Sequence, residues 1–156
     1  MKKLFLFLII VAVVWPFNLA AAGLDSYEFF KLNGESVVGE EIMEGSEKTV
    51  FFFWTSLCYF CRRELTKINN RPIVLDGVKF YYINLGESVK IVNYMVEKLK
   101  LTDVISDDII LDDKTVFAQR FNIIGLPTYL FFKDGKVIYR TNLINEQIVE
   151  RVFNDE

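Results

Sequence analysis

A run of large apolar residues leads directly into the only two cysteines of the chain. Residues 50–54 read Val-Phe-Phe-Phe-Trp, and Cys58 and Cys61 follow after a short polar turn at Thr55 and Ser56. Such a run is typical of a strand that is buried on both faces, and Thr and Ser are favourable residues at a helix start. The stretch therefore predicts a strand, a turn and a helix, with both thiols at the beginning of the helix.

The position of the thiols predicts disulfide chemistry. Unpaired backbone N–H groups and the positive end of the helix dipole stabilise a thiolate at a helix N-terminus, and the thiolate is the nucleophile in disulfide exchange. Cys58, the first and more exposed sulfur, is expected to attack, and Cys61 to resolve the mixed disulfide. An inert bridge is the alternative, but a bridge across so few residues constrains the unfolded chain little.

Other uses of a Cys-x-x-Cys pair need residues that the chain lacks. Structural zinc takes four Cys, His or carboxylate ligands, and covalent haem attachment needs His after the second Cys; Arg62 stands there, and the chain has no His. We therefore expect no cofactor and no metal centre. Two thiolates alone can bind copper(I), so a copper(I)-binding chaperone stays open, although Met43 and Met95 have no reason in the sequence to lie near the pair.

The first 22 residues have the order of a secretory signal peptide. Lys2 and Lys3 precede an uncharged apolar run, and an Ala-x-Ala site ends at Ala22. We expect cleavage after Ala22, which leaves one domain over residues 23–156 in the periplasm or another extracytoplasmic place. Residues 4–22 are also numerous enough to span a bilayer, so a retained signal anchor is the alternative. Export would place the cysteines where disulfides persist.

The charge of the chain argues against nucleic-acid binding. Two of the 18 basic residues and none of the 21 acidic residues lie in the predicted signal, so the remaining chain has a net charge of −5. It has no basic patch for nucleic acid and no polybasic segment for a membrane surface. We expect a monomer whose partners are proteins.

The remaining sequence alternates between strand and helix patterns. In chain order we expect a hairpin about the Asn-Gly turn at 33–34, an irregular acidic segment 39–48, strand 50–54, helix 58–68, strand 78–84, helix 89–99, connector 101–108, strand 109–111, helix 114–121, a hairpin of strands 128–133 and 136–139, and a helix capped by Asn145. Strand–helix–strand units predict parallel pairing, and the late hairpin adds antiparallel strands. The order predicts an α/β protein with a central mixed sheet flanked by helices.

Two segments resemble the thioredoxin superfamily. Residues 53–65 resemble its active-site strand, turn and helix, and residues 121–135 resemble its cis-proline loop and the following hairpin. The signal, the N-terminal hairpin and extra strand and helix residues before Val116 are similar to the exported ResA/TlpA branch. The resemblance implies a thioredoxin fold with an N-terminal β-hairpin and an inserted strand/helix segment.

The resemblance also implies an activity and partners. Members of that branch reduce or exchange disulfides in exported proteins, including apocytochromes c, and draw electrons from a membrane-embedded thiol carrier. This implies an exported thiol–disulfide oxidoreductase whose partners are disulfide-containing exported proteins and such a donor. A redox-inactive module of the same fold that binds peptides is a further alternative.

Substrate-binding residues follow from the same resemblance. Pro127 would be the cis proline, and the backbone of Leu126 would pair with an extended substrate strand. Trp54, Tyr59 and Phe60 would complete the substrate-binding surface.

A glutamate three positions after the second cysteine matches one in the exported branch. Glu64 would exchange a proton with the buried Cys61; a solvent-facing carboxylate near a helix start is the alternative. Phe52 replaces the aspartate that cytosolic thioredoxins bury, which leaves Glu64 as the nearby acid–base candidate. Tyr59 and Phe60 bring no positive charge to a thiolate, so we expect a reductant or moderate exchanger.

Four further residues qualify the resemblance. Leu57 replaces the tryptophan usual before the first cysteine. Asn142 stands where the fold often has glycine, and Asn tolerates left-handed geometry. Arg62 and Arg63 are expected on a solvated helix face, with a role in bringing positive charge to the thiols as the alternative.

Overall fold

The computed structural model describes residues 27–44 and 46–154. The predicted signal peptide and the domain start at residue 23 lie outside this range. In chain order the elements are β1 (Glu28–Lys31), β2 (Ser36–Val38), α1 (Gly39–Glu44), β3 (Lys48–Trp54), α2 (Tyr59–Asn70), β4 (Val78–Leu85), α3 (Val89–Leu99), α4 (Asp103–Ser106), β5 (Ile109–Asp112), α5 (Val116–Arg120), β6 (Thr128–Lys133), β7 (Lys136–Thr141) and α6 (Glu146–Asn154). No helix within the described ranges is both long and apolar enough to cross a bilayer.

The strand that leads to the cysteines lies inside a seven-stranded sheet. The strand order is β2-β1-β5-β4-β3-β6-β7. β4 pairs in parallel with β3 and with β5, and the other neighbours pair antiparallel. Six of the seven residues of β3 are buried, because the strand has a neighbour on each side and helices over both faces. The mixed sheet predicted from the sequence is thereby confirmed.

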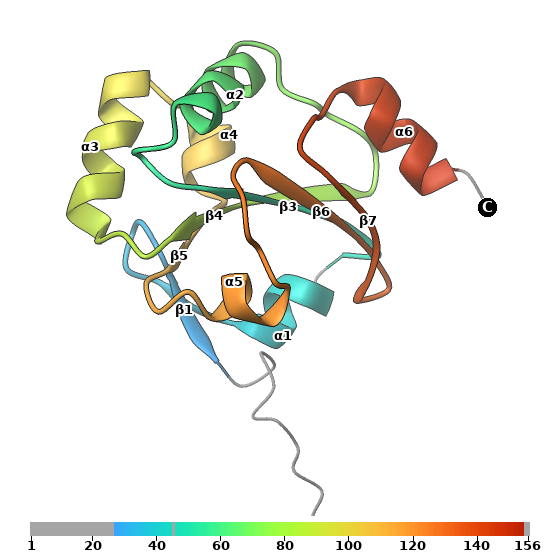
Figure 1. Ribbon diagram of the computed structural model, residues 1–156, viewed down its shortest axis with the longest axis horizontal. Coiled ribbons are helices and arrows are strands. Elements are labelled where there is room, and N and C mark those ends of the chain that lie inside the picture. The colour runs from blue at the N-terminus through green and yellow to red at the C-terminus, as the bar shows by residue number, and fades with distance from the viewer. Residues whose placement is uncertain (1–26, 45, 155–156) are drawn as a thin grey trace, which may run out of the picture.

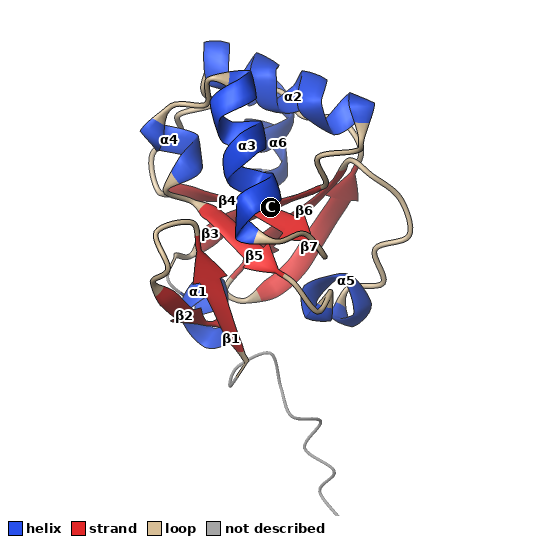
Figure 2. Cartoon of the chain, turned by 90° about the vertical axis from the view of Figure 1, so that its left-hand side faces the viewer, coloured by secondary structure: helices blue, strands red, loops and turns tan. Residues whose placement is uncertain are grey.

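Helices cover the sheet in two layers (Figure 1). α2, α3, α4 and α6 lie on one face, and α1 and α5 lie on the other, which Figure 2 shows from the side. Side chains alternate along a strand, so Phe52 and Trp54 of β3 belong to the core under the first layer, and Phe51 and Phe53 to the core of the second. Cys61 packs in the first core.

Both predicted hairpins are present, and one of them widens the sheet. β1 pairs with β2 and also with β5, where Phe30 lies opposite Leu111. The N-terminal hairpin and the inserted strand therefore extend the same edge. Between β6 and β7, Asp134 and Gly135 both have positive φ (49° and 71°), as the favoured two-residue hairpin turn requires.

Two segments are more regular than the sequence predicted. Residues 39–48, expected to be irregular, contain α1, whose Ile42 is completely buried in the second core. The connector expected at 101–108 contains α4, which follows Thr102 and buries Ile105 in the first core. Such short helices are not stable alone. The burial of one isoleucine in each of these helices stabilises it. A single buried residue produces little hydrophobic periodicity in the local sequence.

Candidate active site

The cysteine turn lies at the edge of the sheet where several strand ends meet. Trp54 at the end of β3 pairs with Asn84 near the end of β4, and Phe53 pairs with Thr128 at the start of β6. The loop after β4 and the loop before β6 therefore run on either side of the turn. Segments far apart in the sequence are brought to the thiols in this way.

The two cysteines differ in exposure. They form a disulfide at the start of α2, with Cys58 half-buried at the N-cap position and Cys61 completely buried. The backbone N–H of Cys61 donates a hydrogen bond to Cys58 Sγ over 3.1 Å. After reduction an N–H in this place would stabilise negative charge on the Cys58 sulfur. The difference in exposure favours Cys58 as the sulfur that another protein reaches first.

A carboxylate that the sequence analysis missed holds the turn before Cys58. Glu87, which follows β4, accepts hydrogen bonds from the Ser56 N–H over 2.7 Å, from the Ser56 hydroxyl, and from the Asn84 amide over 2.8 Å. Ser56 is itself buried, so these contacts fix the backbone beside the thiols. The available signal was positional, because Glu87 follows the strand that pairs in parallel with the cysteine-bearing strand.

Arg62 holds the same turn from the helix side. Its guanidinium donates to the Ser56 carbonyl oxygen over 2.6 Å, and the side chain is half-buried. The expected solvated position is therefore wrong for Arg62, because the turn supplies an acceptor within its reach. Arg63 is exposed, as expected, and its guanidinium lies 6.0 Å from the ring centroids of both Tyr59 and Phe60.

The aromatic residues predicted to bind substrate fall into two groups. Tyr59 and Phe60 are each 59% exposed and contact each other edge to face, so they and the exposed Leu57 form an apolar surface beside Cys58. Trp54 is completely buried in the first core. A direct substrate contact by Trp54 is therefore not retained, because the last residue of the strand turns its ring inward under α2.

Glu64 lies one helical turn beyond Cys61 and is mostly covered. Its side chain is 17% exposed, and its carboxylate lies 3.5 Å from the Lys67 ammonium. The Tyr129 hydroxyl donates a hydrogen bond to Glu64 Oε2 over 3.3 Å. Burial, followed by the nearby Glu64 carboxylate, raises the pKa of Tyr129. The phenol therefore stays protonated as a donor, and the purely solvent-facing alternative does not describe Glu64.

An aromatic ring stands where related cytosolic proteins bury an acid. Phe52 is completely buried and stacks on the Tyr129 ring, with 4.7 Å between centroids and 17° between planes. Tyr82 of β4 meets the same Phe52 ring edge-on. The floor beneath α2 is thus aromatic, and Tyr82 and Tyr129 bring phenols to it.

The loop before β6 is held by side chains as well as by its own backbone. The Leu126–Pro127 peptide bond is cis, as the resemblance implied. Asn142, after β7, donates from its amide to the Pro127 carbonyl oxygen over 2.6 Å, and the Thr128 hydroxyl donates to the Gly125 carbonyl oxygen over 2.7 Å. Asn142 does not have the expected left-handed backbone. Its side chain reaches the loop, a contact that glycine cannot make.

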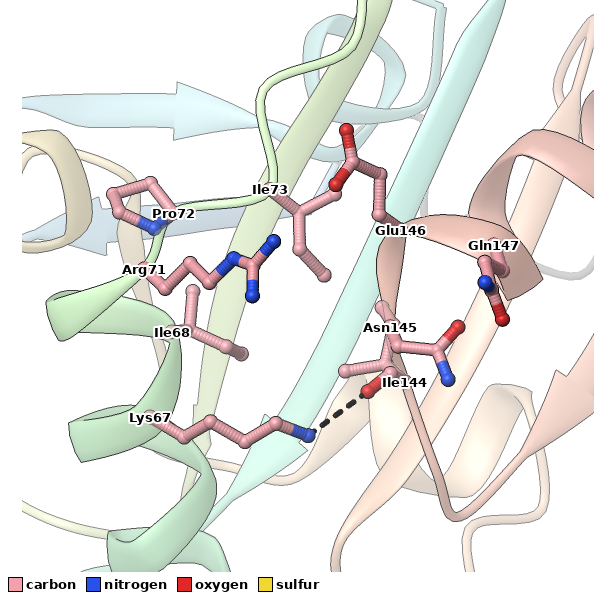
Figure 3. A pocket seen from close by; sticks show the side chains of 9 residues that line it. All are labelled: Lys67, Ile68, Arg71, Pro72, Ile73, Ile144, Asn145, Glu146 and Gln147. Atoms are coloured by element: carbon pink, nitrogen blue, oxygen red, sulfur yellow. Dashed lines mark hydrogen bonds between the residues drawn. The ribbon is translucent and has the colours of Figure 1, made fainter.

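A separate hollow lies between the end of α2 and the start of α6 (Figure 3). Lys67 crosses it and donates to the Ile144 carbonyl oxygen over 3.1 Å. None of the predicted site residues lines this hollow. The hollow therefore lies between two helices of the first layer and is not part of the cysteine site.

Comparison with known proteins agrees with this arrangement. Residues 39–155 match the family model of the thioredoxin-like domain. Over 115 residues the chain is 28% identical to sporulation thiol-disulfide oxidoreductase A of Bacillus subtilis (strain 168), which covers 70% of this chain and 68% of that protein.

Solved structures agree in fold. StoA from Bacillus subtilis superimposes with a TM-score of 0.65 at 22% identity, covering 82% of this chain and 96% of that one. A secreted disulfide oxidoreductase of Mycobacterium tuberculosis gives a TM-score of 0.64 at 23% identity, covering 83% and 96%. Because the family model covers residues 39–155, the chain belongs to the thioredoxin-like family. With its similarity to a thiol-disulfide oxidoreductase, its Cys58–Cys61 pair is the redox site of a thiol–disulfide oxidoreductase.

Proposed function

We propose that this protein is exported and that it reduces or exchanges disulfides in exported client proteins, with apocytochromes c as one client class. The observation that carries the proposal is the Cys58–Cys61 pair at the accessible start of α2, beside the Leu126–Pro127 loop. Export is supported by the signal-like order of the first 22 residues and by a similar protein that is described as secreted.

The first chemical step joins the enzyme to its client. The Cys58 thiolate attacks one sulfur of a client disulfide, the client S–S bond breaks, and the second client sulfur leaves with the electron pair and takes up a proton. The product is a mixed disulfide between Cys58 and the client. The Cys61 N–H at Cys58 Sγ stabilises the attacking thiolate.

The second step releases the client. The Cys61 S–H bond breaks, the proton passes to the Glu64 carboxylate, and the Cys61 sulfur attacks Cys58 Sγ. The bond between Cys58 and the client then breaks, and the client sulfur leaves with its electron pair and is protonated by water. Two electrons have moved from the enzyme dithiol to the client, and the enzyme holds the disulfide seen in the structure.

The client segment lies extended across the turn in this proposal. The backbone of Leu126 pairs with it as an added strand, and apolar client side chains contact the exposed Leu57, Tyr59 and Phe60. Ile124, which is 90% exposed, lies in the loop that precedes Leu126. The protein acts as a monomer, and a membrane-embedded thiol carrier returns the Cys58–Cys61 pair to the dithiol.

The two alternatives are less well supported. A copper(I) carrier would gain from methionine ligands beside the thiols, but Met95 packs in the first core and Met43 against the second, on opposite faces of the sheet. A redox-inactive peptide-binding module gives no reason for a cysteine pair at the accessible helix start. Both alternatives predict that purified protein does not catalyse exchange.

Trapping with serine variants tests the proposal. Cys61→Ser should accumulate covalent complexes with client proteins, because the resolving thiol is missing, and thiol reagents should release them. Cys58→Ser is the matched control and should form none. Mass spectrometry of the complexes from an exported fraction identifies the clients. Mass spectrometry of the free protein locates its N-terminus. Equal activity of Cys61→Ser and wild type would contradict the mechanism, and an intact Met1 in the membrane fraction would indicate a signal anchor.

A further inference from the structure

Tyr129 contacts the carboxylate on which the second step depends. It lies in β6, and its register partner in β3 is Phe52. Phe52 faces the same core as Cys61. The phenol therefore rises from the sheet toward α2 and ends in a hydrogen bond to Glu64 Oε2.

We infer that Tyr129 is a positioning residue that holds the Glu64 carboxylate directed toward the buried side of α2 during resolution of the mixed disulfide. The inference rests on the proposed role of Glu64 as acceptor of the Cys61 proton. Residues at i and i+3 of a helix are neighbours, about 5–6 Å apart at Cβ, so a glutamate side chain can point to Cys61 or swing away into solvent. A hydrogen-bond donor on the sheet side of α2 favours the orientation toward Cys61.

Burial makes this donor persistent. Tyr129 is completely buried, and its ring is fixed by stacking on Phe52. Burial and the neighbouring carboxylate raise the pKa of Tyr129, so the hydroxyl keeps its proton at neutral pH. A hydrogen bond to a charged acceptor is stronger than one between neutral groups, so this contact can hold the carboxylate of Glu64 in place.

The other charged or titratable groups around the pair compete less well for this role. Lys67 also approaches Glu64, but its side chain is 57% exposed and its ammonium is shared with the Ile144 carbonyl oxygen. Arg63 lies on the same outer surface of α2 and is directed to the aromatic rings. Tyr82, from β4, adds to the raised pKa of Tyr129 but makes no hydrogen bond to Glu64 in the described part of the chain.

The test follows the second step alone. The reduced full-length protein reacts with the chromogenic disulfide dithiobis(nitrobenzoate), and the release of the coloured thiolate from Cys58 by Cys61 is timed across the acid and neutral pH range. Tyr129→Phe removes only the hydroxyl and keeps the stacked ring. The acid limb of its pH–rate profile, where the rate falls as the pH is lowered, should move to higher pH by about one unit. The reason is that losing a hydrogen bond to a charged group changes an acid constant by about tenfold.

The matched control is Tyr82→Phe, which deletes a phenol from the same core without touching Glu64. Its acid limb should coincide with that of the wild type. Circular dichroism and thermal unfolding of each variant show whether it is folded, and a merely structural role of Tyr129 would lower the unfolding temperature without moving the acid limb.

A double variant separates action through Glu64 from independent action. Glu64→Gln should lose the acid limb, and Tyr129→Phe combined with Glu64→Gln should behave like Glu64→Gln alone. Superimposed profiles of Tyr129→Phe and wild type, or a further slowing of the double variant, would overturn the inference while leaving Glu64 in its role. An unchanged profile of Glu64→Gln would instead remove the proton-exchange role itself, and the inference with it, while activity of the cysteine pair would still stand.

Discussion

Two strand-to-helix turns at the same edge of the sheet both use backbone N–H groups at a helix start as hydrogen-bond donors. The contacts serve different purposes in the two turns. After β3, the Cys61 N–H donates to Cys58 Sγ. After β5, the carboxylate of Asp112 accepts hydrogen bonds from three successive N–H groups at the start of α5, over 2.6, 2.9 and 3.3 Å. Both strands run parallel to β4, so both turns lie at the carboxyl end of the parallel strands.

The difference between these turns lies in the acceptor atom. A carboxylate accepts several strong hydrogen bonds and does not react with disulfides, and Asp112 is completely buried. A sulfur accepts weakly and can be attacked or attack, and Cys58 stays half-exposed. The same local design therefore stabilises a helix in one place and leaves a reactive atom accessible in the other. We expect substitutions at the Asp112 turn to change stability and those at the cysteine turn to change activity.

The largest expected effect is the loss of activity in Cys58→Ser. Reduction of insulin should fall to the uncatalysed rate, because no nucleophile remains at the helix start. The free energy of unfolding under reducing conditions should change by less than about 1 kcal/mol, since serine is a favourable N-cap. Turbidity of insulin and urea unfolding measure the two quantities. Retained catalysis, or a large loss of stability, would remove the distinction between the two turns.

Asp112→Ala should have the opposite profile. Three backbone N–H groups, one of them buried, would lose their acceptor, and we expect a loss of about 2 kcal/mol in the free energy of unfolding. Insulin reduction per folded molecule should stay within a small factor of wild type. Asp113→Ala, at the exposed neighbouring position, is the matched control and should unfold like the wild type. Equal stability of the two variants would show that Asp112 does not hold α5.

A smaller effect is expected where a side chain holds the loop on the far side of the cysteine turn. Asn142→Gly removes the hydrogen bond to the Pro127 carbonyl oxygen and restores the residue that the fold often has there. We expect a loss of about 1 kcal/mol in stability and an increase in KM for insulin with little change in kcat. Steady-state kinetics separate the two constants. A change in kcat alone would mean that this contact acts on the thiols and not on the client-binding loop.

The smallest expected effect is a pH dependence at the structural turn. Burial raises the pKa of Asp112 above its usual 3.8, although three backbone N–H groups oppose the shift. Between the unfolded and folded pKa values the folded state holds more protons at Asp112. Its contribution to the free energy of unfolding therefore falls as the pH rises through that interval and is constant above it.

Asp112→Asn removes this titration and keeps one carboxamide oxygen as acceptor. The difference in unfolding free energy between wild type and variant should change only in the interval just above the usual pKa of an aspartate. Urea unfolding at a series of pH values measures it. A difference that is the same at every pH would mean that Asp112 titrates alike in both states.

The sequence predicted the structure correctly where short-range pattern carries the information. The buried strand, the helix behind the cysteines and the turn at Asp134 and Gly135 have local signatures and are confirmed. It failed for α1 and α4, where one buried isoleucine in each decides between helix and irregular chain. It also failed for Trp54, because the pattern shows that a strand residue is apolar but not whether its ring ends in the core or at the surface.

The order of residues along the chain determined the chemistry of this protein, and only the folded chain decided what surrounds it. Cys58 and Cys61 lie at a helix start because the spacing of a strand, a polar turn and a helix is local. The contacts of Glu87 with Ser56 and of Tyr129 with Glu64 join segments that are distant in sequence. The first depends on strand order, which places the end of β4 beside the end of β3. The second also depends on register, since a shift by one residue would turn Tyr129 to the other face of the sheet.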